Sequence, residues 1–138
     1  ESEGGRVMAR GEVLASADPN GWWQSPVVIE GLGIDSRCAS EEIFGPVLTL
    51  HAFDDEADAI AMANATAYGL SGTVLTNDLA RAHRVAAALD VGLVWINTWM
   101  ARDLRVPFGG ARDSGLGREG GFEAMRFFTE PRNVCLST

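Results

Sequence analysis

The chain has 138 residues, of which 46% are hydrophobic and 22% charged, a composition typical of one folded domain and not of a disordered polyelectrolyte. Nineteen acidic residues against eleven basic ones give a net charge of −8, which argues against nucleic acid or anionic lipid as partners. The sequence contains no apolar run near the roughly 18 residues that a membrane helix needs and no signal-peptide pattern. A cytoplasmic location is therefore expected.

The first half of the chain predicts two strands, a turn, a third strand and a helix. Strands are expected at residues 7–15 and 26–29, around a turn at 18–21 whose Asp-Pro-Asn-Gly sequence suits a hairpin-like reversal. The β-rich run at 47–50 predicts the next strand. Asp54 and Asp55 are expected as the cap and a first-turn acid of the helix that follows, with Gly69 as its stop. One stripe of this helix carries Ala57, Ile60, Ala61 and Asn64.

The second half continues the alternation of strand and helix. Residues 72–76 predict a strand, Asn77 can cap a helix that ends near Gly92, and residues 93–96 predict a buried strand. Strands that alternate with helices of about ten residues are typical of βαβ units. The predicted fold class is therefore α/β, with a parallel sheet built from consecutive βαβ units and right-handed crossovers.

Two segments at the end of the chain depart from this alternation. Residues 98–121 lose periodicity and gain glycine, which predicts a long loop, and a loop of that length is usually functional or disordered. Residues 127–136 are again strand-like, and Pro131 would restrict this strand to an edge. An edge strand at a chain end can pair with another chain.

Several motifs that could indicate chemistry have simpler explanations. The Gly-x-Gly-x-x-Gly pattern at 115–120 follows a polar, glycine-rich loop instead of a strand, so we interpret it as a turn and not as a dinucleotide fingerprint. Cys38 and Cys135 fit no zinc spacing; both are expected to be reduced, although spacing alone leaves a single disulfide open. His51 and His83 are expected at the surface, and no metal site is predicted.

Two charged groups remain as candidates. Glu41 and Glu42 are adjacent, so they would point about 100° apart on a helix and do not form a catalytic pair; the simpler reading is a solvated helix end. Arg102 and Arg105 lie beside Asp103 in the long loop, where a guanidinium could bind a carboxylate. Pairing of Asp103 with one of these arginines is an equally open alternative.

Three motifs in order resemble the aldehyde dehydrogenase superfamily. They are Glu-Glu-Ile-Phe-Gly-Pro-Val at 41–47, Pro-Phe-Gly-Gly at 107–110 and Ser-Gly-Leu-Gly-Arg-Glu at 114–119, and the resemblance covers essentially the whole chain. The Arg-Asp-Leu-Arg sequence at 102–105 further resembles the branch that oxidises 2-hydroxymuconic and 2-aminomuconic semialdehydes.

The resemblance implies a role for five residues. Glu42 would accept hydrogen bonds from the ribose hydroxyls at the nicotinamide end of NAD or NADP, and Phe44 would lie beside the nicotinamide ring. Arg102 occupies the position of an arginine that helps to bind the substrate carboxylate, with Arg105 assigned to the same site. Phe108 would shape the aldehyde pocket.

The resemblance also implies how the chain is divided. Residues 1–126 would form the C-terminal part of a catalytic domain, and residues 127–138 an oligomerisation strand that joins a second copy or a complementary dehydrogenase segment. The family reaction uses thiolate attack, hydride transfer to NAD(P) and thioester hydrolysis. Neither Cys38 nor Cys135 matches the nucleophile, which lies upstream in the family along with the Rossmann-type domain, so no catalytic residue is assigned.

The predicted function is therefore the C-terminal portion of an NAD(P)-dependent dehydrogenase for a carboxylate-bearing semialdehyde. Two alternatives stay open. The chain could be a non-catalytic assembly or binding module derived from an aldehyde dehydrogenase. It could also be a repurposed small enzyme whose cleft retains Glu42, Asp103, Arg102 and Arg105 for acid–base chemistry.

Overall fold

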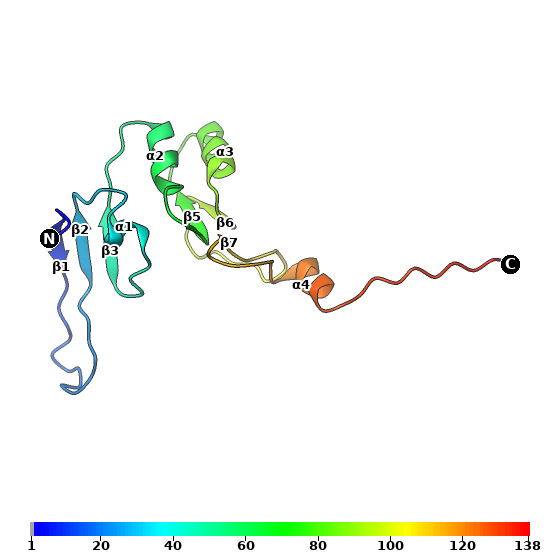
Figure 1. Cartoon of the computed structure of the whole chain (residues 1–138), viewed down its shortest axis with the longest axis horizontal. Helices are drawn as coiled ribbons and strands as arrows, with labels where there is room; N and C mark the ends of the chain where they lie inside the picture. The colour runs from blue at the N-terminus through cyan, green and yellow to red at the C-terminus, as the bar shows by residue number, and fades with distance from the viewer. Residues whose placement is uncertain (1) are drawn as a thin grey trace. The chain divides into compact units, whose positions relative to one another are not determined.

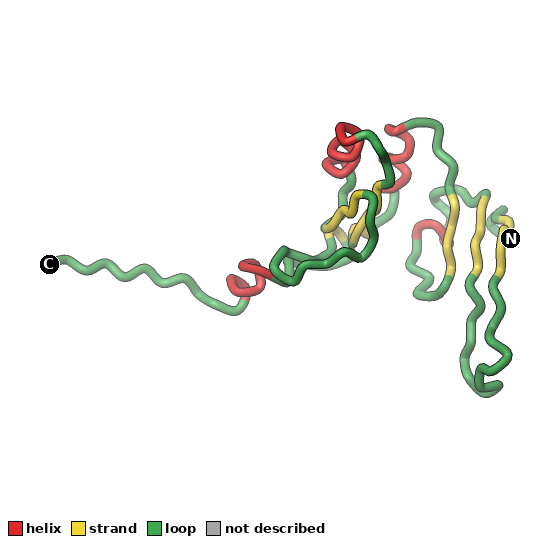
Figure 2. Tube along the Cα trace, turned by 180° about the vertical axis from the view of Figure 1, so that it is seen from behind, coloured by secondary structure: helices red, strands yellow, loops and turns green. Residues whose placement is uncertain are grey.

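The computed structural model describes residues 2–138 and divides into two compact units, Glu1–Thr66 and Ala67–Thr138 (Figure 1). Both units combine strands with helices, so the chain is of mixed α and β structure (Figure 2). The strands fall into three separate sheets. The expected α/β class agrees with this mixture, whereas one parallel sheet built from consecutive βαβ units is not confirmed within the described residues.

The first unit is built on a three-stranded sheet with the order β1-β2-β3. β1 (Arg6–Arg10) and β2 (Val27–Glu30) are antiparallel, whereas β2 and β3 (Val47–Leu50) are parallel. The turn lies where it was predicted, with the amide of Gly21 donating to the carbonyl of Asp18 at 2.9 Å.

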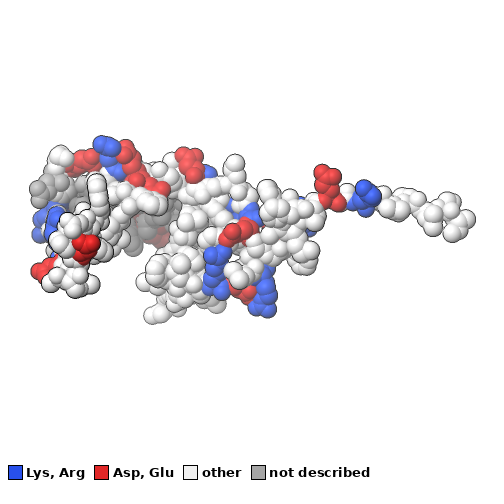
Figure 3. All heavy atoms as spheres, turned by 90° about the horizontal axis from the view of Figure 1, so that it is seen from below, with Lys and Arg blue, Asp and Glu red and all other residues white. Residues whose placement is uncertain are grey.

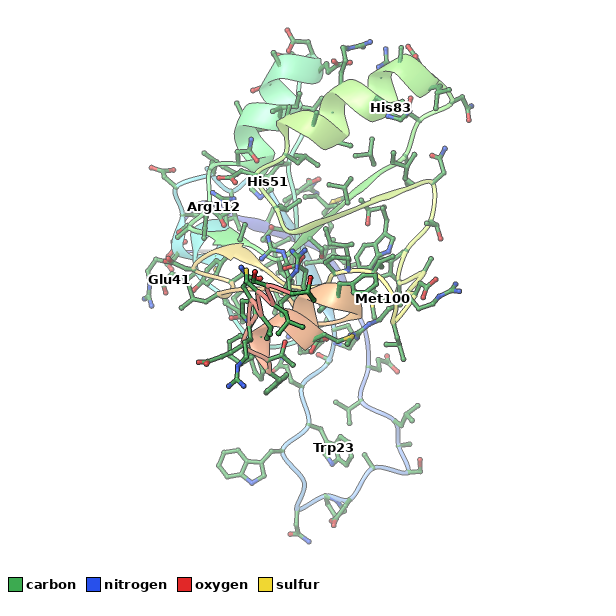
Figure 4. All side chains as sticks on the ribbon, turned by 90° about the vertical axis from the view of Figure 1, so that its right-hand side faces the viewer. Trp23, Glu41, His51, His83, Met100 and Arg112 are labelled. Atoms are coloured by element: carbon green, nitrogen blue, oxygen red, sulfur yellow. The ribbon has the colours of Figure 1, made fainter. Side chains whose placement is uncertain are left out.

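The first strand is shorter than the predicted 7–15. Pairing stops just beyond Arg10, where the amide of Gly11 donates to the carbonyl of Pro26. Pro26 has no N–H to return a hydrogen bond, so the ladder ends there. The hairpin loop between β1 and β2 carries Trp23 (Figure 4), whose indole nitrogen donates to the carbonyl of Asp18 at 2.7 Å.

Two helices complete the first unit. The one-turn helix α1 (Arg37–Ser40) ends at Glu41, and α2 (Glu56–Ala63) begins after Asp55, whose side chain accepts from the amide of Asp58 at 2.9 Å. The cap lies within the predicted Asp54–Asp55 pair, and Asp55 supplies it. The stop at Gly69 is wrong, because α2 already ends at Asn64 and Gly69 belongs to β4.

Replacing Asp55 with alanine removes this cap and is expected to lower the free energy of unfolding by about 1 kcal/mol. Urea denaturation followed by circular dichroism measures the change. Asp54→Ala is the matched control, because the Asp54 side chain makes no hydrogen bond or ion pair within residues 2–138. Equal destabilisation by the two substitutions would show that Asp55 does not act as a cap.

The second unit contains two parallel strands that are connected by a helix. β5 (Ser71–Val74) pairs in parallel with β6 (Leu93–Ile96), and α3 (Leu79–Ala88) connects them. The helix was predicted here, but its cap is Asp78 and not Asn77, since the Asp78 carboxylate accepts from the amide of Arg81 at 3.0 Å. This hydrogen bond lowers the pKa of Asp78.

The remainder of the second unit differs most from expectation. The predicted featureless loop contains β7 (Ala111–Arg112), which pairs antiparallel with β4 (Tyr68–Gly69), and the helix α4 (Gly121–Phe127) was not predicted. The predicted strand at 127–136 is not formed: Phe127 ends α4, and residues 128–138 have no regular structure. A strand requires a hydrogen-bonded neighbour, and this segment has none among the described residues.

Each unit has a very small core. Among the described residues only four hydrophobic side chains are buried: Val27 and Leu32 in the first unit, and Ala82 and Trp95 in the second. Many large apolar side chains remain exposed, and Figure 3 shows wide uncharged areas between the acidic and basic groups. Exposed apolar surface on this scale is typical of surfaces that another protein segment covers.

Candidate functional site

The acidic motif of the first unit lines an open groove of about 260 Å³ between α1 and β3. Glu42 and Phe44, the two residues that the resemblance assigns to the cofactor, both line this groove. The full lining is Cys38, Glu41, Glu42, Ile43, Phe44, Gly45, Val47 and Thr49. Phe44 has a positive φ of 54° and is 93% exposed, so its ring is available to a ligand.

The two adjacent glutamates have different surroundings. Glu41 accepts two hydrogen bonds at 3.0 Å from the guanidinium of Arg37, which lowers the pKa of Glu41 and raises that of Arg37. Glu42 has no side-chain partner in residues 2–138. The expected solvated helix end therefore describes Glu41, whereas the Glu42 carboxylate remains open to an external donor.

The groove presents a carboxylate and an exposed aromatic ring. A carboxylate with two acceptor oxygens suits a pair of ribose hydroxyls, and an exposed aromatic ring suits stacking or edge contact with a flat heterocycle. Glu42 and Phe44 supply both groups within three positions of the chain.

The second unit brings three side chains of the long loop together. Nη2 of Arg102 donates to Oε1 of Glu119 at 2.5 Å, and the guanidinium carbon of Arg102 lies 4.3 Å from the centre of the Phe108 ring. Phe108 and Glu119 are antiparallel neighbours whose backbones exchange two hydrogen bonds of 2.8 Å. The guanidinium thus rests on an aromatic face beside a carboxylate.

Trp95 of β6 and Asn97, just after β6, hold the start of the loop that carries Arg102. Trp95 is buried, and its indole nitrogen donates to the carbonyl of Ala101 at 2.8 Å, directly before Arg102. Asn97, with a φ of 53°, exchanges two 2.8 Å hydrogen bonds with the backbone of Thr76. These contacts anchor the start of the loop at the carboxyl ends of β5 and β6.

Arg105 pairs with Asp103, which was one of the two alternatives left open by the sequence. Its guanidinium donates to both oxygens of Asp103, at 2.9 and 3.1 Å from Nε and at 2.5 Å from Nη2. The side chain of Arg105 is 89% exposed, and the cation over the Phe108 ring is Arg102. Binding of a substrate carboxylate through Nε and Nη2 of Arg105 would require these two atoms to release Asp103.

The Asp103–Arg105 pair gives a testable pH dependence. Hydrogen bonds from the side chain and backbone of Arg105 lower the pKa of Asp103 below its ordinary value, so the pair persists above that value and opens as the pH falls through the lowered pKa. Carboxyl titration by NMR should show this low midpoint. Arg105→Ala should raise the Asp103 midpoint, whereas Arg126→Ala should leave it unchanged; an unchanged midpoint in Arg105→Ala would contradict the pairing.

The glycine-rich segment folds the loop back on itself. Gly117 and Gly120 have φ of 71° and 82°, and Arg118 between them donates to the carbonyls of Gly110 and Gly117 at 2.7 Å. The segment lies between β7 and α4 and is used for turns. The interpretation of this motif as a turn agrees with the structure.

Sequence reasoning missed three residues of this site: Trp95, Asn97 and Glu119. Glu119 was noted only as a letter of the Ser-Gly-x-Gly-Arg-Glu motif. The glycines between Phe108 and Glu119 indicated a chain reversal that would bring the two residues together. No sequence signal paired Glu119 with Arg102, because an ion pair between residues 17 positions apart depends on the loop path.

The other predictions about chemistry can be checked within residues 2–138. Both cysteines are free in the structure, with Cys38 partly exposed and Cys135 exposed. His83 lies on α3 (Figure 4), where it is exposed. In the described part of the chain there is no cluster of three potential metal ligands, and none of its helices is long and apolar enough to span a membrane.

Comparison with known proteins gives the family. Residues 1–134 match the aldehyde dehydrogenase family. The chain belongs to this family. A 2-aminomuconic 6-semialdehyde dehydrogenase from a Pseudomonas species is 49% identical over 97% of this chain, and a 2-hydroxymuconic semialdehyde dehydrogenase from Pseudomonas sp. strain CF600 is 43% identical over 97%. In both cases this aldehyde dehydrogenase chain spans 28% of the relative's length.

Solved aldehyde dehydrogenases share the fold. A putative aldehyde dehydrogenase from Burkholderia cenocepacia superposes with a TM-score of 0.90 at 45% identity, covering 96% of this chain and 27% of the other. A betaine aldehyde dehydrogenase from Staphylococcus aureus, solved with NAD⁺, superposes with a TM-score of 0.85 at 38% identity over 92% of this chain and 25% of its own. The two motif-bearing segments described above thus belong to an aldehyde dehydrogenase fold.

Proposed function

We propose that this chain is the part of an NAD(P)-dependent aldehyde dehydrogenase that binds the nicotinamide end of the cofactor and the carboxylate of a semialdehyde substrate. The observation that carries the proposal is the guanidinium of Arg102 over the Phe108 ring, in a chain similar to muconic semialdehyde dehydrogenases. The substrate would be of the 2-hydroxymuconic or 2-aminomuconic semialdehyde type, and the product the corresponding acid.

Charge supports the assignment of Arg102. The chain carries a net charge of −8, so an anionic substrate needs a local cation to approach it. A planar guanidinium matches a carboxylate with two parallel hydrogen bonds. Glu119 takes one N–H of Nη2, so the second N–H of Nη2 can still act together with Nε or Nη1 toward a carboxylate. Phe108 holds the guanidinium plane and at the same time offers an apolar wall to the aldehyde chain.

Glu42 and Phe44 would hold the cofactor. When bound, the nicotinamide ring accepts a hydride from the substrate carbon. The carboxylate of Glu42 would accept the ribose hydroxyls and so fix the sugar, and Phe44 would shield one side of the ring from water. Cys38 lies in the wall of the same groove, but we place the nucleophilic thiol in a part of the protein outside these residues.

The C-terminal segment would serve assembly. We propose that residues 1–126 complete a catalytic domain and that residues 127–138 form an oligomerisation strand against a second copy or a complementary dehydrogenase segment. Val134 and Leu136 are 79% and 88% exposed and alternate with polar neighbours, as in a strand that buries one face on pairing. A cytoplasmic location accords with this assembly.

A second candidate function rests on the small core. An assembly module without turnover would also expose apolar side chains such as Leu116, Phe128 and Leu136 for contact with dehydrogenase subunits. Such a module would not require the cation–aromatic arrangement of Arg102 and Phe108, so we favour the catalytic role.

An assay of the complete protein separates the two functions. Purified protein is mixed with NAD⁺ or NADP⁺ and either an acid-bearing semialdehyde or a neutral aldehyde of equal length, and reduced nicotinamide is followed by absorbance. The proposal expects turnover with a preference for the acid-bearing aldehyde. Association with dehydrogenase subunits in native mass spectrometry, without turnover of any aldehyde, would favour the assembly module.

A further inference from the structure

Arg102, the proposed binding group for the substrate carboxylate, already contacts the carboxylate of Glu119. Arg102 is proposed to attract a negatively charged substrate, yet one of its nitrogens already donates to the Glu119 carboxylate at 2.5 Å. The Arg102 side chain is 46% exposed and that of Glu119 63% exposed, so solvent and a ligand can reach both groups. A substrate carboxylate at this guanidinium would therefore lie close to a second negative charge.

We propose that Glu119 sets the selectivity of the site for substrate charge by acting on Arg102. This inference rests on the proposed role of Arg102 in carboxylate binding. Glu119 is a positioning residue: its hydrogen bond holds the guanidinium on the Phe108 ring, and its charge partly offsets the attraction that Arg102 exerts on an anion. For an acid-bearing aldehyde, the first effect strengthens binding at Arg102 and the second weakens it. Neither effect changes the binding of a neutral aldehyde.

The backbone explains why Glu119 keeps this place. Phe108 and Glu119 exchange two backbone hydrogen bonds of 2.8 Å, so the position of one fixes the other. Because Arg102 contacts both side chains, the ring and the carboxylate constrain the guanidinium from two directions. Neither contact uses Nε or Nη1, which remain available to a substrate carboxylate.

Two substitutions separate the two effects of Glu119. Glu119→Gln keeps an oxygen that can accept the hydrogen bond but removes the charge, whereas Glu119→Ala removes both. We expect Glu119→Gln to raise the ratio of kcat/KM for the acid-bearing aldehyde to that for the neutral aldehyde by about two- to five-fold, the size of an exposed charge interaction. Glu119→Ala should give a lower ratio than Glu119→Gln, because the guanidinium loses its anchor.

The matched control is Glu123→Gln. Glu123 pairs with Arg126 on α4 at 3.2 Å, is also a surface carboxylate, and its substitution changes the net charge by the same amount. It makes no contact with Arg102, so the ratio should not change. The gain in Glu119→Gln should also shrink at high salt, because it arises between exposed charges.

Turnover and binding in the complete protein provide the test. If Glu119→Gln lowers turnover of both aldehydes, the dissociation constant of adipate, a dicarboxylate probe, should still fall by about two- to five-fold. An unchanged or lower ratio together with unchanged or weaker adipate binding would overturn the inference. Arg102→Ala distinguishes the two proposals. If it lowers kcat/KM equally for both aldehydes, the proposed function fails. If it lowers kcat/KM mainly for the acid-bearing aldehyde while Glu119→Gln leaves the ratio and adipate binding unchanged, only the role of Glu119 fails.

Discussion

Replacing Arg102 with alanine in the complete protein is expected to lower kcat/KM for an acid-bearing semialdehyde by about 30- to 100-fold, mainly through KM. The substitution removes a charge-assisted, two-bond contact that a carboxylate makes with the guanidinium. A neutral aldehyde of the same length forms no such contact, so its kcat/KM should change by less than about three-fold. Steady-state kinetics on both aldehydes gives the two values.

Arg126→Ala is the control for this experiment, because Arg126 is also a surface arginine paired with a glutamate, at 3.2 Å in α4. Arg126→Ala should leave kcat/KM for both aldehydes unchanged. Equal losses for the two aldehydes in Arg102→Ala would mean that Arg102 supports the loop or the fold and does not recognise the carboxylate.

Replacing Gly92 with alanine is expected to destabilise the second unit by about 3 kcal/mol or more. A Cβ at this position would lie 1.7 Å from the carbonyl oxygen of Gly109, which belongs to the Pro-Phe-Gly-Gly motif. The backbone of that motif would have to move away from the start of β6. Since Phe108 precedes Gly109, the support of Arg102 would move with it.

Chemical denaturation measures this effect, with Gly45→Ala as the comparison. A Cβ at Gly45 would meet only the Cγ2 atom of Ile43 at 3.9 Å, an ordinary contact, so its effect on the unfolding midpoint should be small. A Gly92→Ala protein as stable as Gly45→Ala would show that the close approach of Gly92 and Gly109 does not exist in solution.

Local patterns in the sequence predicted the elements that depend on local signals. The strands at 47–50 and 93–96, an aspartate cap for α2 within the pair Asp54–Asp55 and the turn at 18–21 all follow from residue type and spacing within a few positions. The cap predicted for α3 was wrong by one residue. Asn77 and Asp78 are both good capping residues, and the helix is capped by Asp78.

Features that depend on distant contacts could not be predicted in the same way. The assembly of strands into one sheet, and the strand expected at 127–136, both need neighbours, and residues 2–138 do not supply them. α4 was missed because it begins at two glycines, which locally favour a loop.

The candidate site shows the same division between local and distant contacts. Glu42 and Phe44 were grouped only by the family resemblance, and the pairing of Arg105 with Asp103 was one of the two alternatives that the sequence left open. The contact of Arg102 with Glu119 depends on the reversal of the whole loop, which brings together the ends of the segment from Phe108 to Glu119.

A crystal structure of the complete protein with a dicarboxylate product, the acid formed from a muconic-type semialdehyde, tests the central claim most directly. The distance between the remote carboxylate of the product and the guanidinium of Arg102 decides the question. Carboxylate binding by Arg102 predicts a hydrogen-bond distance of about 2.7–2.9 Å. A product whose remote carboxylate is held by other residues, with Arg102 still bound only to Glu119, would contradict it.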